Sequence, residues 1–462
     1  MPKRFCYVII NNMDKKFDDT KTPAGSGRKT VSFVTLGCKV NQYDTDAMRD
    51  LFLKRGYTSV QDGEADIYVI NTCSVTQTGD KKSRQMIRRI HREYPHALIA
   101  VSGCYAQLAP QEIEKIEGVG VVVGTQNRAR IVDYAEEALQ GRMVNAVGDI
   151  MACREFEELP VDGHDIENTR AFMKIQEGCN NYCTFCIIPY ARGRLKSRNP
   201  QSAVHEAARL VEEGYKEIVL TGIHLGNYGV DRKDGSSLAS LVKGLLSVSG
   251  LKRIRLGSIE SVELSPELTE LIRNEPRVCP HLHLPIQSGS DSVLKRMNRH
   301  YRLQEYKKLI RTLRSEIPDL ALTTDLIVGF PGETEELFQE TMDTLEELRF
   351  SAIHVFPYSR RPGTPAAAFP DQVPEAVKHE RVRRVREKEA LYSLEYRSRF
   401  IGREVSVLAE GEKDGVYEGL SDTYIRVRMR GQGLQRGHIY EVHISSADEE
   451  GLEGIVEKED VS

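Results

Sequence analysis

The sequence predicts an α/β protein of three domains: an N-terminal parallel α/β domain, a partial (β/α)6 barrel and a small C-terminal OB-like β-barrel. Strand-like and helical segments alternate over most of the chain, which is typical of parallel sheets covered by helices. After about residue 400 the apolar pattern changes to a period of two, interrupted by glycine-containing turns, which favours a small all-β barrel. A chain of 462 residues also exceeds one ordinary core and fits two to four domains.

Composition narrows the class of protein before any motif is considered. Hydrophobic residues make up 40% and charged residues 29%, which indicates a soluble globular protein. No apolar run approaches the roughly 20 residues that span a bilayer, and the polar start lacks a signal-peptide pattern. We therefore expect a cytoplasmic protein with no membrane partner. The net charge of −4 does not decide whether local basic faces bind nucleic acid.

The N-terminal domain is expected over residues 29–150, after a flexible leader at 1–28 that lacks periodicity. Expected strands and helices alternate here; the strands are Val31–Leu36, Asp66–Ile70 and Ala97–Val101, and the helices are Asp46–Arg55, Thr76–Glu93 and Pro110–Ile116. Each strand runs into a cysteine: Cys38, Cys73 and Cys104. The carboxyl ends of parallel strands share one edge, where ligands bind, so the three thiols should meet there.

The barrel domain is expected over residues 165–395, joined to the first domain by a linker at Asp162–Asn168. Six strands are expected: Phe172–Gln176, Glu217–Thr221, Arg253–Gly257, His281–Pro285, Leu322–Val328 and Ala352–Phe356. Six β/α units indicate an open, incomplete barrel whose active site lies at the carboxyl ends of the strands. A charged helix at Glu375–Arg399 follows, with a loose apolar stripe of Val382, Val385, Leu391 and Leu394. Residues 396–460 form the expected β domain.

The spacing of Cys179, Cys183 and Cys186 is the most informative feature of the sequence. Three thiolates within eight residues can hold three corners of a cubane cluster and leave the fourth iron open for a small molecule. The alternative is a zinc site, which usually needs four ligands in a closed tetrahedron. No fourth Cys or His follows at zinc-finger spacing, so the pattern favours iron–sulfur over zinc. Disulfides are not expected in a reducing compartment.

This Cys-x3-Cys-x2-Cys pattern at the end of the first barrel strand resembles the signature of the radical S-adenosylmethionine (SAM) superfamily, and Phe185 before the third cysteine fits it. The resemblance implies a [4Fe–4S] cluster whose open iron chelates the amino and carboxylate groups of SAM. Electron transfer, from a donor such as flavodoxin or ferredoxin, then cleaves SAM to methionine and a 5′-deoxyadenosyl radical.

Five further stretches make the chain similar to the methylthiotransferase family from about residue 30 to 458. They are Thr35-Leu-Gly-Cys38-Lys-Val-Asn41, Asn71-Thr-Cys73, Ser102-Gly-Cys104, His283-Leu-Pro-Ile-Gln-Ser-Gly289 and Asp325-Leu-Ile-Val-Gly-Phe-Pro-Gly-Glu-Thr334. In that family the N-terminal cysteine trio holds a second, auxiliary [4Fe–4S] cluster that carries or donates sulfur. Cys6, Cys153 and Cys279 receive no function, because a buried cysteine is commonly a small hydrophobe.

Residues near the strand ends are candidates for binding SAM. Arg192, in the basic loop after the cluster motif, could pair with the methionine carboxylate, although an ordinary surface arginine is the alternative. The other candidates are Gly222, Ser258, Glu260, Gln287 and Phe330, with Phe185 beside the cluster. Gly222 could mark only a turn, and Glu260 could be a solvated loop acid. Contacts from Phe330 to adenine rest on the family resemblance.

Recognition of RNA is assigned mainly to the C-terminal domain, which resembles a TRAM domain. Arg426, Arg428 and Arg430 alternate along one strand and therefore share a face that suits phosphate pairing, with a solvated strand face as the alternative. Arg194 is a further RNA candidate, and a basic cluster at Lys81-Lys82-Ser-Arg84 could hold the anticodon stem or only keep its helix soluble. A radical must reach the target base, which favours an unstacked loop nucleotide of tRNA.

The form Thr35-Leu-Gly-Cys-Lys-Val-Asn-Gln-Tyr43 resembles the branch that acts on N6-threonylcarbamoyladenosine beside the anticodon. The resemblance implies that a methylthio group is attached to adenine C2, with one SAM supplying the methyl group and another the radical. The alternatives are the same chemistry on isopentenyladenosine or on a ribosomal-protein aspartate. A non-catalytic iron–sulfur carrier is disfavoured, because a carrier has no use for a six-unit barrel.

Overall fold

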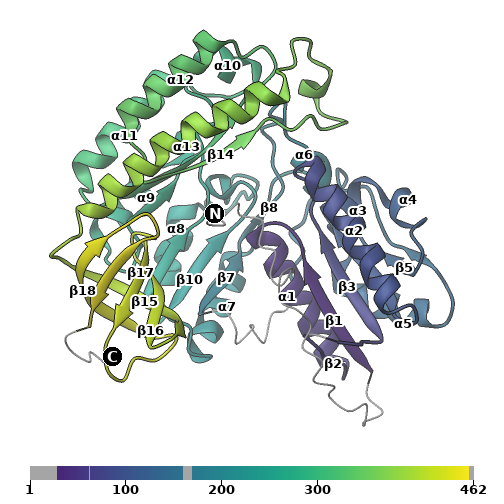
Figure 1. The fold of residues 1–462 in the computed structure, drawn as a ribbon. Coiled ribbons are helices and arrows are strands. Elements are labelled where there is room, and N and C mark those ends of the chain that lie inside the picture. The colour runs from purple at the N-terminus through teal and green to yellow at the C-terminus, as the bar shows by residue number, and fades with distance from the viewer. Residues whose placement is uncertain (1–28, 62, 160–168, 457–462) are drawn as a thin grey trace.

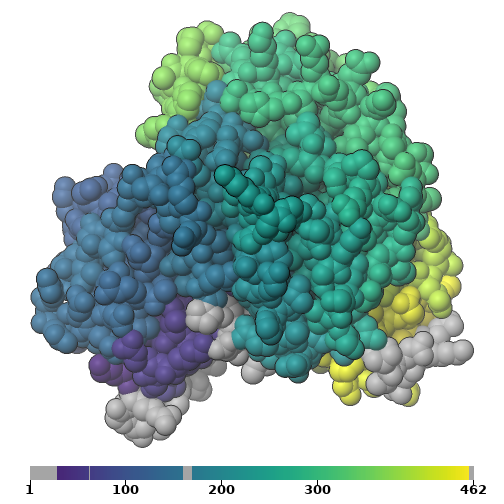
Figure 2. All heavy atoms as spheres, turned by 180° about the vertical axis from the view of Figure 1, so that it is seen from behind, coloured from purple at the N-terminus to yellow at the C-terminus, as the bar shows by residue number. Residues whose placement is uncertain are grey.

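The computed structural model describes residues 29–61, 63–159 and 169–456. These residues form an N-terminal domain, a partial barrel and a C-terminal β-barrel (Figure 1). The expected leader at 1–28 and the expected linker at Asp162–Asn168 lie outside the described residues. In Figure 1 the N-terminal domain lies at the right, the partial barrel at the centre and top, and the C-terminal β-barrel at the lower left. Seen from behind in Figure 2, the two smaller units flank the partial barrel.

The N-terminal domain is a six-stranded, entirely parallel sheet in the order β2-β1-β3-β4-β5-β6. Its strands are β1 (Thr30–Thr35), β2 (Thr58–Ser59), β3 (Ile67–Thr72), β4 (Leu98–Gly103), β5 (Val119–Val122) and β6 (Val144–Asn145). Its helices are α1 (Lys39–Lys54), α2 (Gln77–Glu93), α3 (Cys104–Leu108), α4 (Pro110–Ile113) and α5 (Ile131–Leu139), with the 3-10 turn η1 (Arg128–Arg130). Alternate residues such as Val69 and Ile70 enter separate apolar clusters on the two faces, as a sheet covered by helices on both sides requires.

The partial barrel contains the six parallel strands that the sequence predicts: β7 (Arg170–Lys174), β10 (Glu217–Thr221), β11 (Arg253–Leu256), β12 (His281–His283), β13 (Ala321–Val328) and β14 (Ala352–Pro357). They form two three-stranded sheets that isolated bridges join between β11 and β12, at Ile254–Val278 and Ser258–His283. The covering helices are α7 (Pro200–Glu212), α8 (Leu238–Leu246), α9 (Pro266–Asn274), α10 (Asp291–Arg296), α11 (Leu303–Glu316) and α12 (Glu335–Leu348).

Shorter elements connect these units near the strand ends. They are β8 (Gln176–Glu177), β9 (Lys196–Ser197), α6 (Ile188–Arg192) and the 3-10 turns η2 (Leu225–Asn227), η3 (Ser261–Glu263) and η4 (Pro365–Ala368). The turn before α12 is closed by Gly329 and Gly332, both at positive φ, and the Thr334 hydroxyl accepts from the Leu337 amide at 3.4 Å. Thr334 therefore caps α12 as predicted.

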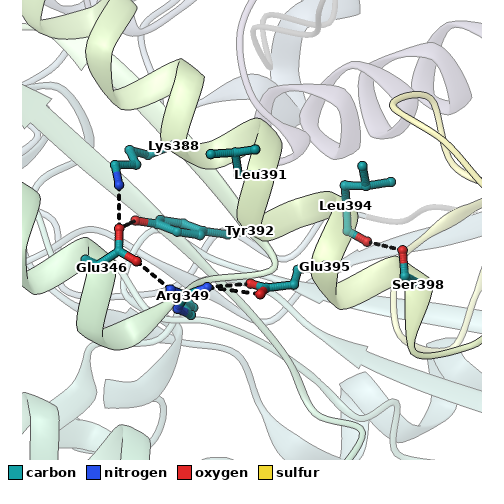
Figure 3. A pocket seen from close by; sticks show the side chains of 8 residues that line it. All are labelled: Glu346, Arg349, Lys388, Leu391, Tyr392, Leu394, Glu395 and Ser398. Atoms are coloured by element: carbon teal, nitrogen blue, oxygen red, sulfur yellow. Dashed lines mark hydrogen bonds and ion pairs between the residues drawn. The ribbon is translucent and has the colours of Figure 1, made fainter.

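Helix α13 (Glu375–Ser398) crosses the outside of β13 and β14 and leads to the C-terminal domain. Val382 and Val385 are buried as predicted, but Leu391 is 63% exposed, so the predicted apolar stripe is wrong there. Leu391 lies at a surface hollow between α12 and α13 that Figure 3 shows. Glu346 and Arg349 pair across this hollow with Lys388 and Glu395, so ion pairs rather than apolar contacts join the two helices there.

The C-terminal domain is a closed β-barrel in the order β15-β16-β17-β19-β18. Its strands are β15 (Glu404–Lys413), β16 (Val416–Ser421), β17 (Arg426–Arg430), β18 (Ile439–Ala447) and β19 (Leu452–Ile455). Val407, Val427, Val442 and Leu452 fill its core together with Phe400 from the end of α13. Across the described parts of the chain, none of the helices has both the length and the apolar character that crossing a membrane requires.

Candidate active site

The three N-terminal cysteines, here called the auxiliary triad, lie at the carboxyl ends of neighbouring strands. Cys38 is the N-cap of α1 after β1, Cys73 follows β3, and Cys104 begins α3 directly after β4. Burial and the neighbouring Cys104 and Cys38 raise the pKa of Cys73 to about 12. Because β1 lies between β2 and β3, the triad is at the point where the strand order reverses, which is where open α/β sheets bind ligands.

The side-chain amide of Asn41 holds these loops together. The Asn41 side chain donates to the carbonyl oxygens of Leu36 at 2.7 Å and Thr72 at 3.1 Å, which joins the loops before Cys38 and Cys73. Gly37, at φ +117°, must remain a glycine because an added Cβ would lie 2.9 Å from the Cys73 Cβ. The edge of the sheet is therefore built for close approach of the two cysteine loops.

The second set, Cys179, Cys183 and Cys186, is here called the barrel triad and occupies the loop after β8. The Thr184 amide and hydroxyl donate to the carbonyl oxygens of Met297 and Arg296 at 3.0 and 2.9 Å, which anchors this loop on the end of α10. Burial raises the pKa of Cys186 to about 12. Gly178, at φ +74°, starts the loop where an added Cβ would lie 1.9 Å from the Arg194 carbonyl oxygen.

Two basic side chains that sequence reasoning missed contact sulfurs of the barrel triad. Arg299 donates to Cys183 Sγ at 3.3 Å and also binds Glu260. His224 Nδ1 lies 3.7 Å from Cys179 Sγ, and its other ring nitrogen pairs with Glu263. Although burial alone lowers the pKa of His224, Cys179 and Glu263 raise it to about 10. His224 lies two residues after the predicted Gly222, but Arg299 has no sequence signal.

The predicted SAM-binding residues lie around the barrel triad at different depths. Gly222 follows β10 and packs on Gln176, whose side chain accepts from the His224 amide at 2.6 Å. Ser258 is exposed beyond β11, and Glu260 reaches Cys183 through Arg299. Gln287 has a left-handed backbone at φ +61°, an unfavourable conformation that often marks a functional position. Their contact with SAM remains a prediction.

The predicted aromatic residues form a packed group behind the cluster loop. Phe185 meets Phe330 edge-on with ring centroids 6.5 Å apart, and Phe330 also packs against Tyr358 and Phe369. Phe330 is fully buried in this group. It therefore packs behind the loop of the barrel triad, and its contact with adenine remains a prediction.

Arg192 lies in a different place from the one that the sequence suggested. It ends α6, the short helix that starts just after Cys186, and its guanidinium is fully buried against the auxiliary triad. Nε donates to Cys104 Sγ at 3.3 Å, and Nη1 pairs with Asp44 at 2.8 Å and with Glu177. Arg192 is therefore not the ordinary surface arginine of the alternative interpretation. Its pairing with the SAM carboxylate remains a prediction.

Further contacts place the auxiliary triad against the barrel mouth. After β14, Arg361 binds Asp80 at 2.6 Å and the Ser74 hydroxyl at 2.8 Å, beside Cys73. On the other side Tyr43 of α1 donates to Glu206 of α7 at 3.1 Å. The edge of the N-terminal sheet that carries the auxiliary triad therefore faces the partial barrel.

The predicted RNA-binding arginines share one face of β17, but they are not equivalent. Arg428 is surrounded by Asp448, Glu450 and Glu453, and Arg426 pairs with Glu418 at 2.8 Å. Arg430 is exposed at the end of the strand. Arg194 is also exposed, next to the barrel triad, and Lys81 is exposed on α2 after Cys73. Binding of RNA by these residues remains a prediction.

The donor chemistry of both triads fits iron–sulfur clusters. In each triad the thiols lie close enough to raise one another's pKa, and a basic side chain donates to at least one of the sulfurs. Among the described residues, no three His, Cys, Asp or Glu side chains converge closely enough to share a single metal ion. A cubane cluster spaces its thiolates more widely, because each one binds a different iron. Cys279 is fully buried beside Arg255 and Cys153 contacts Gln126, and both lie outside the triads.

Comparison with known proteins agrees with this arrangement. A model of the radical SAM superfamily matches residues 173–345, and one of an uncharacterized protein family, UPF0004, matches residues 30–124. The chain is 48% identical to the threonylcarbamoyladenosine tRNA methylthiotransferase MtaB of Bacillus subtilis (strain 168), covering 90% of this chain and 94% of that protein. The MtaB of Thermotoga maritima is 41% identical, with 92% and 96% covered.

Relatives of lower sequence identity and a solved structure are also similar to this chain. A tRNA-2-methylthio-N(6)-dimethylallyladenosine synthase of Pelotomaculum thermopropionicum is 39% identical over 84% of this chain and 88% of that protein. Among solved structures, the radical SAM methyltransferase TsrM of Kitasatospora setae aligns with a TM-score of 0.55 and 16% identity, covering 73% of this chain and 77% of that one, which shows a shared fold. Given relatives of this identity over nearly the whole chain, it belongs to the radical SAM methylthiotransferase family.

Proposed function

We propose that this protein attaches a methylthio group to C2 of N6-threonylcarbamoyladenosine next to the anticodon of tRNA. The observation that carries the proposal is that one short helix, α6, connects the two cysteine triads: it begins just after Cys186, and Arg192 at its end donates to Cys104 Sγ. Two relatives in sequence are named threonylcarbamoyladenosine tRNA methylthiotransferase. A simple electron carrier would not need two cysteine triads and a six-unit partial barrel.

The cofactors are SAM and two [4Fe–4S] clusters, which membership of the family implies in general terms. In our proposal Cys179, Cys183 and Cys186 hold the cluster that binds SAM, and Cys38, Cys73 and Cys104 hold the auxiliary one. When bound, these groups supply radical and sulfur chemistry. The chain itself orients them: Arg299 and His224 fix two sulfurs of the barrel triad, and Asn41 fixes the loops of the auxiliary triad.

The barrel interior offers polar groups for the modified base. His283 binds Thr323 at 2.8 Å and Asp325 at 3.3 Å, and burial together with His283 lowers the pKa of His354 to about 4. These rings lie on β12 and β14, facing one another with centroids 5.7 Å apart. His354 is therefore neutral at physiological pH and can form hydrogen bonds without adding charge to the cavity.

Lys39 is a candidate for recognising the threonyl carboxylate. It follows Cys38 directly, and its ammonium lies 5.6 Å from the ring of Phe172 in the partial barrel and 5.5 Å from the ring of Tyr424 in the C-terminal barrel. It thus stands where all three units meet, close to the auxiliary triad. Threonylcarbamoyladenosine carries a carboxylate and isopentenyladenosine does not, so an ammonium here favours the first substrate.

The remaining assignments complete the proposal. The domain boundaries are 29–150, 165–395 and 396–460, of which 62, 165–168 and 457–460 lie outside the described residues. Arg194, Arg426, Arg428 and Arg430 bind the anticodon arm, and of the three strand arginines Arg428 is the least exposed. Reducing electrons come from a small donor such as a flavodoxin or ferredoxin.

Mass spectrometry of tRNA nucleosides tests the function. Anaerobically reconstituted enzyme, SAM and reductant are offered threonylcarbamoyl- and isopentenyladenosine tRNA separately. The matched variants are Cys183→Ala, which removes a cluster ligand, and Cys279→Ala, which removes a buried cysteine outside both triads. We expect a methylthio mass gain on the first tRNA only, lost in Cys183→Ala and kept in Cys279→Ala.

Other outcomes separate the alternatives. A gain only on isopentenyladenosine would replace the substrate, and SAM cleavage without a gain on either tRNA would point to the ribosomal-protein aspartate. If Lys39 recognises the carboxylate, Lys39→Met raises KM for the threonylcarbamoyl tRNA more than it lowers kcat. An unchanged KM would remove Lys39 from the binding site without affecting the assigned reaction.

A further inference from the structure

A cluster of buried charges occupies the seam between the N-terminal domain and the partial barrel. Its carboxylates are Asp44 of α1 and Glu177 of β8, and its cations are Arg128, Lys174 and Arg192. All five side chains are essentially inaccessible to solvent. Isolated buried charges are very unfavourable, so each must be balanced by partners within the seam.

Fully buried cations outnumber fully buried carboxylates in this cluster. Three such cations meet two such carboxylates, and the third carboxylate, Glu157, binds Arg128 alone among the three cations. Arg192 is the member that contacts a cysteine, through Nε and Cys104 Sγ at 3.3 Å. An anionic thiolate-bound cluster at Cys104 would balance the excess charge.

We propose that Arg192 is a positioning residue that tunes the auxiliary cluster, through its hydrogen bond to the Cys104 sulfur, so that this cluster accepts an electron more readily. This inference rests on the assignment of that cluster to Cys38, Cys73 and Cys104. Hydrogen bonds to sulfur and nearby positive charge both stabilise the reduced, more negative form of a cluster. Arg192 supplies both, and its place at the end of α6 links this effect to the loop that holds the barrel triad.

A purely structural role for Arg192 makes a different prediction, and Arg128 provides the comparison. Arg128 is equally buried and binds the same two carboxylates, Asp44 and Glu177, but its described contacts do not include a cysteine sulfur. Removing either arginine takes one positive charge from the seam and weakens the same domain contact. Only removal of Arg192 takes a donor away from Cys104.

The test is a reductive titration of the full-length, anaerobically reconstituted protein, with dithionite as the electron source and electron paramagnetic resonance as the readout. The variants are Arg192→Gln, Arg192→Lys and Arg128→Met, each also measured with Cys183→Ala so that the auxiliary cluster is seen alone. Iron content and thermal unfolding are recorded for each protein. If Arg192→Gln retains too little iron to titrate, Arg192→Lys, which keeps the charge, decides the question.

We expect Arg192→Gln to shift the reduction equilibrium of the auxiliary cluster about tenfold toward the oxidised form, or about 59 mV for one electron. Arg192→Lys should shift it less, and Arg128→Met should lower thermal stability with a smaller shift. An unchanged auxiliary potential in both Arg192 variants would overturn the proposal, as would an equal shift in Arg128→Met. If the unsubstituted protein binds iron at the barrel triad only, the assigned auxiliary cluster itself is wrong.

Discussion

The contact between the partial barrel and the C-terminal barrel depends on one buried carboxylate, and Glu217→Gln tests this. Glu217 begins β10 and is completely buried, and it accepts from Arg255 Nε at 2.7 Å and lies 3.5 Å from Arg253 Nη1. The two arginines continue across the interface. Arg255 donates to the carbonyl oxygens of Ser421 and Asp422 at 3.0 and 2.8 Å, so Glu217 positions the groups that hold the C-terminal barrel.

The expected magnitude follows from the pKa of Glu217. Burial alone would raise this pKa, but Arg255, Arg170 and Arg253 lower it from 4.5 to about 2. That difference corresponds to about 3 kcal/mol of folding free energy at neutral pH. Because the folded pKa is the lower one, the contribution is complete above pH 4.5 and is lost as the pH falls toward 2. The Gln variant leaves two buried arginines without a carboxylate and should lose about 3 to 5 kcal/mol at pH 7.

The measurement needs a reporter confined to the C-terminal barrel. Because the chain has no tryptophan, a single introduced tryptophan can serve as that reporter. A Tyr417→Trp background places a single indole against the barrel core, and its fluorescence follows urea unfolding of that domain. The exposed Glu404→Gln is the matched control at the start of β15. The difference in unfolding free energy between the unsubstituted protein and the Glu217→Gln variant should shrink by roughly 2 kcal/mol from pH 7 to pH 3. A difference below about 0.5 kcal/mol at pH 7, or one that does not change with pH, would refute the reasoning.

Three other perturbations have definite expected outcomes. Gly37→Ala should remove the auxiliary cluster and lower bound iron by about half, whereas Gly56→Ala, also at positive φ but with open space around it, should not; iron analysis decides. Arg430→Ala should weaken tRNA binding and reduce the slope of log binding constant against log salt concentration by about one. Arg428→Ala should have a smaller effect, because acidic side chains already surround Arg428, and filter binding at several salt concentrations measures both. Burial raises the pKa of Glu333 to about 7, so the buried charge should destabilise the fold as pH rises from 5 to 8, and Glu333→Gln should flatten the melting-temperature profile.

The strands of the partial barrel could be predicted because each is a short apolar run that ends at a polar or glycine residue. Strand β16 of the C-terminal barrel has a weaker sequence signal, since Glu418 and Gly419 interrupt its apolar pattern. Gly419 is there because an added Cβ would lie 2.2 Å from the Leu408 carbonyl oxygen of the neighbouring strand β15. A residue that weakens the local strand signal is thus the one that lets two strands of the closed barrel approach.

Helix α1 shows why the site was harder to predict than the fold. The sequence places its start at Asp46, but the helix begins at Lys39, and the polar residues Asn41, Gln42 and Asp44 of its first turns are buried. Polarity along the chain does not reveal that Lys174 and Arg192 of the partial barrel pair with Asp44. The same reason applies to Arg192, because its partners Cys104 and Asp44 belong to the N-terminal domain and its local sequence does not indicate them.

Each unit closes its own apolar core, whereas the seams that place the cysteines are joined by buried charge. The N-terminal domain and the partial barrel are joined by Arg192 with Asp44, and elsewhere by Arg361 with Asp80. The partial barrel and the C-terminal barrel are joined by Arg255, which donates to the Asp422 carbonyl oxygen. Desolvation offsets most of the attraction in such pairs, so they add little to stability beyond what apolar contacts would give. They are directional, however, and a guanidinium that must reach fixed oxygens and a sulfur permits few relative positions of two domains. These seams therefore fix the relative positions of the two triads more than they strengthen the fold.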